Sequence, residues 1–221
     1  ETENEEWYLK KETGRLERSQ VNAYCATKED IKSMVKFISS YSLYAYEDEM
    51  KRGFITMQGG HRIGVAGQVV MDGGKVLSLS NIYFLNIRVA REKRGCAKDI
   101  IPYLIHRNNI YNTLFVSPPG IGKTTYLRDA IRILSNGSDR LHGMKISIID
   151  ERSEIAACRQ GIPQNDIGIR SDVLDGCLKS FGMLLMLRSM APQIIAVDEI
   201  GSREDLAALQ RIAVCGTGVL A

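Results

Sequence analysis

The sequence has 221 residues, of which 44% are hydrophobic and 25% are charged, and its formal net charge at pH 7 is +3. This composition is ordinary for a packed, soluble chain of one large or two modest domains, and the mild positive charge does not by itself argue for a nucleic-acid partner. No apolar run approaches the roughly 20 residues that a membrane-spanning helix needs, so we expect no transmembrane segment.

The chain opens with a polar arm, ETENEEW, which we expect to be frayed. A helix is predicted over residues 27–40, where Thr27 and Asp30 fit a capping box ahead of apolar residues at helical spacing. A second, short helix is expected over residues 41–51, because the next residues bring a glycine and then strand-like sequence.

Glycine-rich turns divide the next stretch of sequence. Gly59-Gly60 and Asp72-Gly73-Gly74 separate three strand-like runs, which predicts a β-meander. Residues 86–92, NIRVARE, predict one more strand. Residues 1–95 therefore predict a small α+β N-terminal domain.

From residue 96 to residue 221, strand-like and helix-like segments alternate. Such alternation predicts a parallel sheet covered by helices on both faces. Because the sequence ends inside the last strand-like run, we expect a further sheet element to follow it. The predicted strands are 112–117, 144–150, 193–199 and 218–221, and the predicted helices are 123–135, 173–190 and 203–214.

The stretch VSPPGIGKTT, residues 116–125, joins a predicted strand to a predicted helix, which is the context of a phosphate-binding P-loop. Ser117 stands where the pattern G-x-x-x-x-G-K-[ST] has its first glycine, and the two prolines after it favour the turn that this position requires. We expect Lys123 to reach the β- and γ-phosphates of ATP and the Thr124 hydroxyl to bind Mg²⁺. The predicted nucleotide-binding residues are Ser117, Pro118, Pro119, Gly120, Ile121, Gly122, Lys123, Thr124 and Thr125.

An acidic pair, Asp198 and Glu199, ends the apolar run IIAV. In a P-loop NTPase, Asp198 would lie near the metal ion, and Glu199 would act as the general base that polarises the attacking water. The alternative is a pair of acids that merely ends a strand at a solvated edge.

Two further groups of residues are candidates for the same site. Asp150, Glu151 and Glu154 follow another predicted strand, at the sheet edge where ligands bind in α/β folds, although acids are common at strand ends. Arg188, after a Leu- and Met-rich helix, would point at phosphate or at a neighbouring subunit, or else would only complement the helix dipole. We count Glu199, Glu151 and Arg188 as the candidate catalytic residues.

Several patterns are missing from the sequence. No N-K-x-D guanine-binding motif follows the P-loop, which favours adenine nucleotide, and the aromatic-studded basic faces of nucleic-acid platforms are absent. The five cysteines are scattered without a C-x-x-C pair, which argues against a zinc site and against a disulfide framework.

The segments GGHRIGVAG, LNIRVARE, VSPPGIGKTTYLRD, IIDERSEI and LRSMAPQIIAVDEIG, in this order, resemble the stage III sporulation AA family of endospore-forming bacteria. The resemblance runs from about residue 27 to the end of the chain. The wider relatives are secretion-superfamily ATPases, which carry a small N-terminal domain before a RecA-like core and usually form hexameric rings. The resemblance thus implies a RecA-like P-loop domain over residues 96–221, C-terminally incomplete, after the N-terminal domain of residues 1–95.

Residue by residue, the resemblance gives IIDERSEI the place of the family's acidic box and puts Glu199 on the Walker B glutamate. The family often has glycine at the position of Asp198, which leaves open which acid contacts Mg²⁺ through water. The family's histidine-bearing box is expected beyond Ala221. An arginine from the N-terminal domain or from a neighbour would complete the site, for which Arg62, Arg88 and Arg91 are candidates.

The resemblance also implies a biological role. The family is thought to power a channel apparatus between mother cell and forespore, together with membrane proteins of that apparatus. We therefore expect a homo-oligomeric ATPase motor in the mother-cell cytoplasm, associated peripherally with the membrane and binding no nucleic acid. The alternatives are a nucleic-acid-dependent ATPase of the RecA or helicase kind and a scaffold that ATP orders but that hydrolyses it negligibly.

Overall fold

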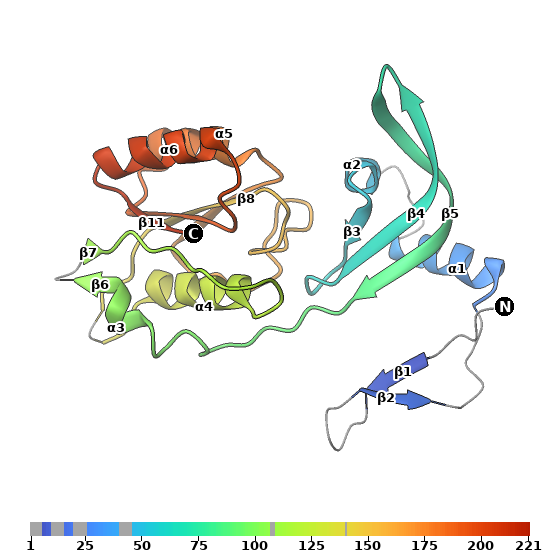
Figure 1. The fold of residues 1–221 in the computed structure, drawn as a ribbon, viewed down its shortest axis with the longest axis horizontal. Helices are drawn as coiled ribbons and strands as arrows, with labels where there is room; N and C mark the ends of the chain where they lie inside the picture. The colour runs from blue at the N-terminus through green and yellow to red at the C-terminus, as the bar shows by residue number, and fades with distance from the viewer. Residues whose placement is uncertain (1–5, 10–15, 20–25, 40–45, 107–108, 140) are drawn as a thin grey trace. The chain divides into compact units, whose positions relative to one another are not determined.

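The computed structural model describes residues 6–9, 16–19, 26–39, 46–106, 109–139 and 141–221 (Figure 1). The chain divides into two compact units. The first comprises Glu1–Lys51 and Val65–Leu85, and the second comprises Arg52–Gly64 and Asn86–Ala221. The division of the sequence at residue 95 stays a prediction. No helix in the described part of the chain combines the length and apolar character that crossing a bilayer requires.

In the first unit, β1 (Glu6–Leu9) pairs antiparallel with β2 (Leu16–Ser19), so the end of the arm expected to be frayed belongs to a strand. Residues 1–5 of that arm lie outside the described residues.

The first predicted helix is confirmed as α1 (Lys28–Ile38). Its capping box is present, because the Thr27 hydroxyl accepts the Asp30 N–H at 3.2 Å and the Asp30 carboxylate accepts the Thr27 N–H at 2.8 Å. The second predicted helix is present as α2 (Glu47–Lys51), and residues 41–45 of that prediction lie outside the described residues.

The predicted meander is confirmed as the sheet β3–β4–β5. Its strands are β3 (Phe54–Thr56), β4 (Arg62–Asp72) and β5 (Lys75–Arg88). The separate strand predicted over 86–92 is wrong. Residues 86–88 are the end of β5, since no glycine or proline interrupts that run, and residues 89–92 have no regular structure.

The second unit contains a four-stranded parallel sheet with the order β11–β10–β8–β9. The strands are β8 (Ile146–Asp150), β9 (Ser171–Asp175), β10 (Ile194–Val197) and β11 (Gly218–Leu220). Figure 1 shows α4 (Lys123–Asn136) on one side of this sheet and α5 (Lys179–Ser189) and α6 (Arg203–Val214) on the other. The predicted α/β fold with a parallel sheet is therefore confirmed.

The core of this unit lies on both faces of the sheet, because successive side chains of a strand point to opposite faces. In β10, Ile194 and Ala196 belong to the cluster that contains the apolar residues of α4. Ile195 and Val197 belong instead to the cluster with α5 and α6. All four residues are fully buried, which explains why the strand reads as a continuous apolar run.

Two predicted elements of this unit differ from the structure. Residues 112–117 do not form a buried strand. They follow β11 in parallel through the bonds of Thr113 and Phe115, while Leu114 and Val116 are exposed. The helix predicted over 173–190 is also wrong in its first part, because residues 171–175 form β9 alongside β8 and α5 begins only at Lys179.

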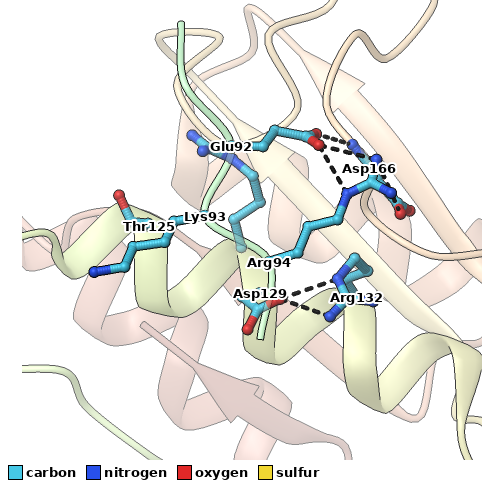
Figure 2. A pocket seen from close by; sticks show the side chains of 8 residues that line it. Glu92, Lys93, Arg94, Thr125, Asp129, Arg132 and Asp166 are labelled. Carbon is cyan, nitrogen blue, oxygen red and sulfur yellow. Dashed lines mark hydrogen bonds and ion pairs between the residues drawn. The ribbon is translucent and has the colours of Figure 1, made fainter. Parts of the chain in front are cut away.

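The connection that follows β5 is held by contacts with Asp166 (Figure 2) and with α4. Glu92 accepts the Asp166 N–H at 2.6 Å and the Arg94 Nε at 3.0 Å. Three residues further on, the Ala97 N–H donates to the buried Asp129 of α4 at 2.8 Å. The connection then enters a short helix and hairpin that were not predicted: α3 (Ile101–Leu104), β6 (Ile105–His106) and β7 (Asn109–Ile110).

Candidate nucleotide-binding site

The P-loop lies between the segment along β11 and the start of α4. Gly120 and Gly122 have φ values of +78° and +105°, which favour glycine, and nothing would lie within 4 Å of a Cβ on Gly120. Because α4 begins at Lys123, its first N–H groups and the positive end of its dipole face the loop. The backbone is therefore shaped for close approach of an anion.

Ser117 closes the loop in place of the expected glycine. Its carbonyl oxygen accepts the Lys123 Nζ at 2.8 Å, and its hydroxyl donates to the Pro118 carbonyl oxygen at 3.1 Å. The Lys123 ammonium group is thus held across the loop, at the position from which it would meet phosphate. Ser117 does not disrupt this arrangement.

The Thr124 hydroxyl donates to Oδ1 of Asp198 at 2.9 Å, which joins the P-loop helix to the residue that follows β10. Burial, together with the nearby carboxyl groups of Glu154 and Asp150, raises the pKa of Asp198 to about 6 against the opposing effect of the Thr124 hydrogen bond. A hydroxyl and a carboxylate at this distance are the hard oxygen ligands that Mg²⁺ prefers, so Thr124 and Asp198 fit that ion.

A cavity of about 590 Å³ lies beside these residues. Glu199 lines it with a side chain that is 60% exposed, and its nearest cationic partner is the Arg152 Nη1 at 3.8 Å. The carboxylate is therefore accessible to water. The lining also includes Leu114, Phe115, Val116, Ser117, Lys123, Asp198, Ile200, Gly201, Ser202, Arg203, Leu206 and Ala221.

Asp150, the last residue of β8, shapes the acidic loop at residues 151–156. Its buried carboxylate accepts the N–H groups of Glu154, Ile155 and Ala156 at 2.7, 3.0 and 2.8 Å. Burial raises the pKa of Asp150 in spite of these three bonds. Its contacts within the chain hold the backbone of the loop.

The other two acids of this box have cationic partners. Glu151 forms a close ion pair with Lys179 at the start of α5. Glu154 lies 3.3 Å from the Arg62 Nη1, which also donates to the Arg152 carbonyl oxygen at 3.3 Å. The Arg62 guanidinium group lies 3.6 Å above the Phe54 ring, so β3 and β4 deliver a cation to the acidic loop.

The remaining candidate arginines do not join this group in the described part of the chain. Arg188 is in the last turn of α5 and lines a cavity of about 770 Å³ between α5 and α6. The chain passes from α5 into the amino end of β10, and Asp198 follows the carboxyl end of that strand. Arg188 therefore lies toward the amino ends of the strands, whereas the P-loop helix contacts Asp198 at their carboxyl ends. Arg88 ends β5 and Arg91 follows it, and both are exposed.

Sequence reasoning missed two residues that hold the site. Arg128 of α4 donates to the backbone of the acidic loop, and Lys179 neutralises Glu151. Both residues are visible in the sequence as cations in predicted helices. The sequence does not identify their partners, because these lie 26 to 28 residues away along the chain.

The sequence is similar to those of two named proteins. It is 46% identical over 198 residues to Stage III sporulation protein AA of Bacillus subtilis (strain 168), and the match covers 90% of this chain and 64% of that protein. It is 31% identical over 139 residues to Protein SEEDLING PLASTID DEVELOPMENT 1 of Arabidopsis thaliana, covering 62% of this chain and 19% of that protein. The chain thus spans less than two thirds of the length of either relative.

Among solved structures, the chain resembles the Legionella pneumophila ATPase DotB with a TM-score of 0.56 at 17% identity, covering 93% of this chain and 56% of that one. This likeness supports the RecA-like P-loop fold. The family described as "Sporulation stage III, protein AA" matches residues 7–221, which is nearly the whole sequence. The chain therefore belongs to the sporulation stage III protein AA family.

Proposed function

We propose that this chain binds ATP together with Mg²⁺ at the P-loop and hydrolyses it. The observation that carries the proposal is the 2.9 Å hydrogen bond between Thr124 and Asp198, beside Lys123 at the start of α4. The loop and helix N-terminus bind the phosphates, and Lys123 contributes a positive charge at the β- and γ-phosphates. Mg²⁺, held through Thr124 and Asp198, would neutralise charge that develops on the phosphate oxygens.

The hydrolytic step needs a positioned water and a base. Glu199 is the residue proposed for this role, because its exposed carboxylate lines the cavity next to Lys123 and Asp198. The water oxygen bonds to the γ-phosphorus, the bond from that phosphorus to the bridging oxygen breaks, and the water proton passes to Glu199. The pairing of Glu151 with Lys179 makes Glu151 a supporting residue in this proposal.

Family membership and fold support a proposal about the wider role. We propose a motor of the secretion-ATPase type that powers a channel apparatus between mother cell and forespore during sporulation. The working form would be a homo-oligomeric ring, with six subunits as the expected number, on the cytoplasmic side of the mother-cell membrane. Membrane proteins of the apparatus would hold it there, and Arg188 would act across a subunit boundary.

Binding of a fluorescent ATP analogue to the chain, with and without Mg²⁺, tests the first step. We expect saturable Mg²⁺-dependent binding that Lys123→Ala abolishes, because the substitution removes the charge at the phosphates. Equal binding by both proteins would contradict the proposed site. Phosphate release by the wild type, compared with Glu199→Gln, then tests hydrolysis.

The turnover assay also distinguishes other functions that this fold supports. We expect Glu199→Gln to bind nucleotide but to release phosphate at least about 100-fold more slowly, since a general base contributes about that factor or more. Binding without turnover in the wild type would favour a scaffold ordered by ATP. Stimulation of turnover by single-stranded DNA or RNA would favour a nucleic-acid-dependent ATPase.

A further inference from the structure

Arg128 lies on α4, five residues after Lys123, and faces the acidic loop. Its Nε donates to the Ile155 carbonyl oxygen at 2.6 Å, and its Nη2 donates to the Glu154 carbonyl oxygen at 2.6 Å. The side chain is partly buried, and this burial lowers the pKa of its guanidinium group although nearby carboxylates oppose the effect. A partly buried cation that donates to two consecutive backbone carbonyl oxygens indicates a specific positioning role.

The two sides of the acidic loop are held by different residues. Asp150 accepts the N–H groups of residues 154–156, while Arg128 donates to the carbonyl oxygens of the same segment. Asn165 adds a third donor, since its Nδ2 lies 2.8 Å from the Ile155 oxygen. Without Arg128, the Glu154 carbonyl oxygen loses the donor described for it. The planar fork of an arginine fits two consecutive carbonyl oxygens, whereas a lysine ammonium group reaches as a single point charge.

The loop backbone determines where the Glu154 side chain lies. That carboxyl group is 3.3 Å from the Arg62 Nη1, and its charge helps to raise the pKa of the nearby Asp198 carboxyl. Asp198 in turn binds the Thr124 hydroxyl of α4. The P-loop helix therefore contacts Asp198 through Thr124 and the acidic loop through Arg128.

We propose that Arg128 is a positioning residue that fixes the acidic loop to the P-loop helix and so keeps Glu154 in place beside Asp198. The role rests on the proposed ATPase function, because its catalytic consequence is expressed in hydrolysis. Among the described residues, the hydrogen bonds of the Arg128 side chain go to the acidic loop and not to the phosphate-binding loop. Its loss therefore affects turnover and loop order, and leaves nucleotide affinity nearly unchanged.

The test compares wild type with Arg128→Lys and Arg128→Met in two independent measurements. In hydrogen exchange of the full chain without nucleotide, we expect the amides of residues 154–156 to exchange about tenfold faster in both variants, as the loss of hydrogen bonds to a charged group implies. In steady-state hydrolysis, we expect kcat to fall about 10- to 100-fold, because small misplacements of catalytic groups cost that much. Nucleotide affinity should change less than about threefold.

Arg132→Lys is the matched control. Arg132 lies one turn further along α4, and its guanidinium group binds the Asp129 carboxylate instead of the acidic loop. We expect wild-type exchange at residues 154–156 and wild-type kcat in this variant. Thermal unfolding of each variant identifies general destabilisation, and the Lys substitution retains the charge if the Met variant does not fold.

Unchanged exchange of residues 154–156 in a folded Arg128→Lys variant would overturn the proposal. A loss of nucleotide affinity equal to the loss of kcat would also overturn it, because Arg128 would then act on the P-loop. If the wild type binds ATP but does not hydrolyse it, the proposed ATPase function fails. The exchange measurement would still decide whether Arg128 positions the loop.

Discussion

At the scale of single residues, the P-loop residues could be predicted because the pattern that indicates them is local in sequence. Lys123 and Thr124 follow a glycine in a short pattern, and the backbone between Gly120 and Lys123 supplies most of the geometry. Arg128 depends instead on a loop that the fold brings to it from a distant part of the chain. Neither its residue type nor its helical position distinguishes it from a solvated arginine.

Thr124→Val tests the proposed Mg²⁺ site. The substitution keeps the side-chain shape and removes the hydroxyl that donates to Asp198 at 2.9 Å. We expect ATP affinity in the presence of Mg²⁺ to fall about tenfold or more, since a metal ligand and a charged hydrogen bond are lost together. Affinity measured in EDTA should fall far less. Thr124→Ser, which restores the hydroxyl, is the control, and an equal loss with and without Mg²⁺ would contradict the assignment.

Asp205 gives a prediction about pH. Burial alone would raise its pKa, but hydrogen bonds from the Gly201 and Ser202 N–H groups and from the Ser202 side chain outweigh burial and lower the pKa below its ordinary value of 3.8. The folded chain therefore binds this proton more weakly than the unfolded chain does. The resulting stability is complete above that ordinary value and is lost as the pH falls through the folded-state pKa.

Urea unfolding of wild type and Asp205→Asn between pH 7 and pH 3 measures this contribution. We expect wild type to be more stable at neutral pH and the difference to shrink toward the acid end, because protonated Asp205 loses the charge that Asn lacks throughout. A difference that stays constant over the whole range would show that the charge of Asp205 is irrelevant.

At the scale of elements, local end signals decided which predictions succeeded. The prediction of α6 over 203–214 is confirmed at both ends, and α4 differs from its prediction by one residue. In contrast, the Val-Leu pair at 173–174 fits a helix or a strand equally well. Its pairing with Ile148 and Ile149 of β8 makes it part of β9, and Gly176 with φ +66° separates that strand from α5. Non-local pairing of this kind leaves no local pattern.

Ser202→Ala tests what the cap of α6 contributes. The Ser202 hydroxyl accepts a hydrogen bond from the Asp205 N–H at 3.0 Å, and the backbone N–H of Ser202 donates to the Asp205 carboxylate at 3.0 Å. We expect the free energy of unfolding to fall by about 1 kcal/mol, as for other N-cap serines. Ser189→Ala is the control, since that hydroxyl bonds to the Leu185 carbonyl oxygen within α5 and its removal should change the free energy by less than about 0.5 kcal/mol. Equal effects of the two substitutions would remove the basis for the cap.

At the scale of the whole molecule, the main difficulty for sequence reasoning is that β4 and β5 run through both compact units. The predicted boundary at residue 95 is the point after which strand-like and helix-like segments alternate in the sequence. The compact units divide the chain at other residues, because Arg52–Gly64 belongs with Asn86–Ala221. Contacts from that early segment explain the grouping: Gly59 N–H donates to Gln164 at 3.0 Å, and His61 Nδ1 accepts the Ala90 N–H at 3.0 Å. No sequence pattern in residues 52–64 predicts these contacts.

The two divisions of the chain predict different cooperative units, which native-state hydrogen exchange in increasing urea distinguishes. Because Ile55 and Ile63 are buried and belong to the second unit, we expect the β3–β4 amides around them to share the opening free energy of β8 and β10. The amides of residues 68–72 and 76–80, in the first unit, should open at lower urea, since many of their side chains are exposed. Arg62→Ala removes the contacts to Glu154 and to the Arg152 carbonyl oxygen. We expect this substitution to lower the exchange protection of the amides around Ile63 more than that of residues 76–80. If residues 54–63 open together with 68–80 and independently of β8, the boundary at residue 95 is the physical one, and Arg62 reaches the acidic loop from a separate domain.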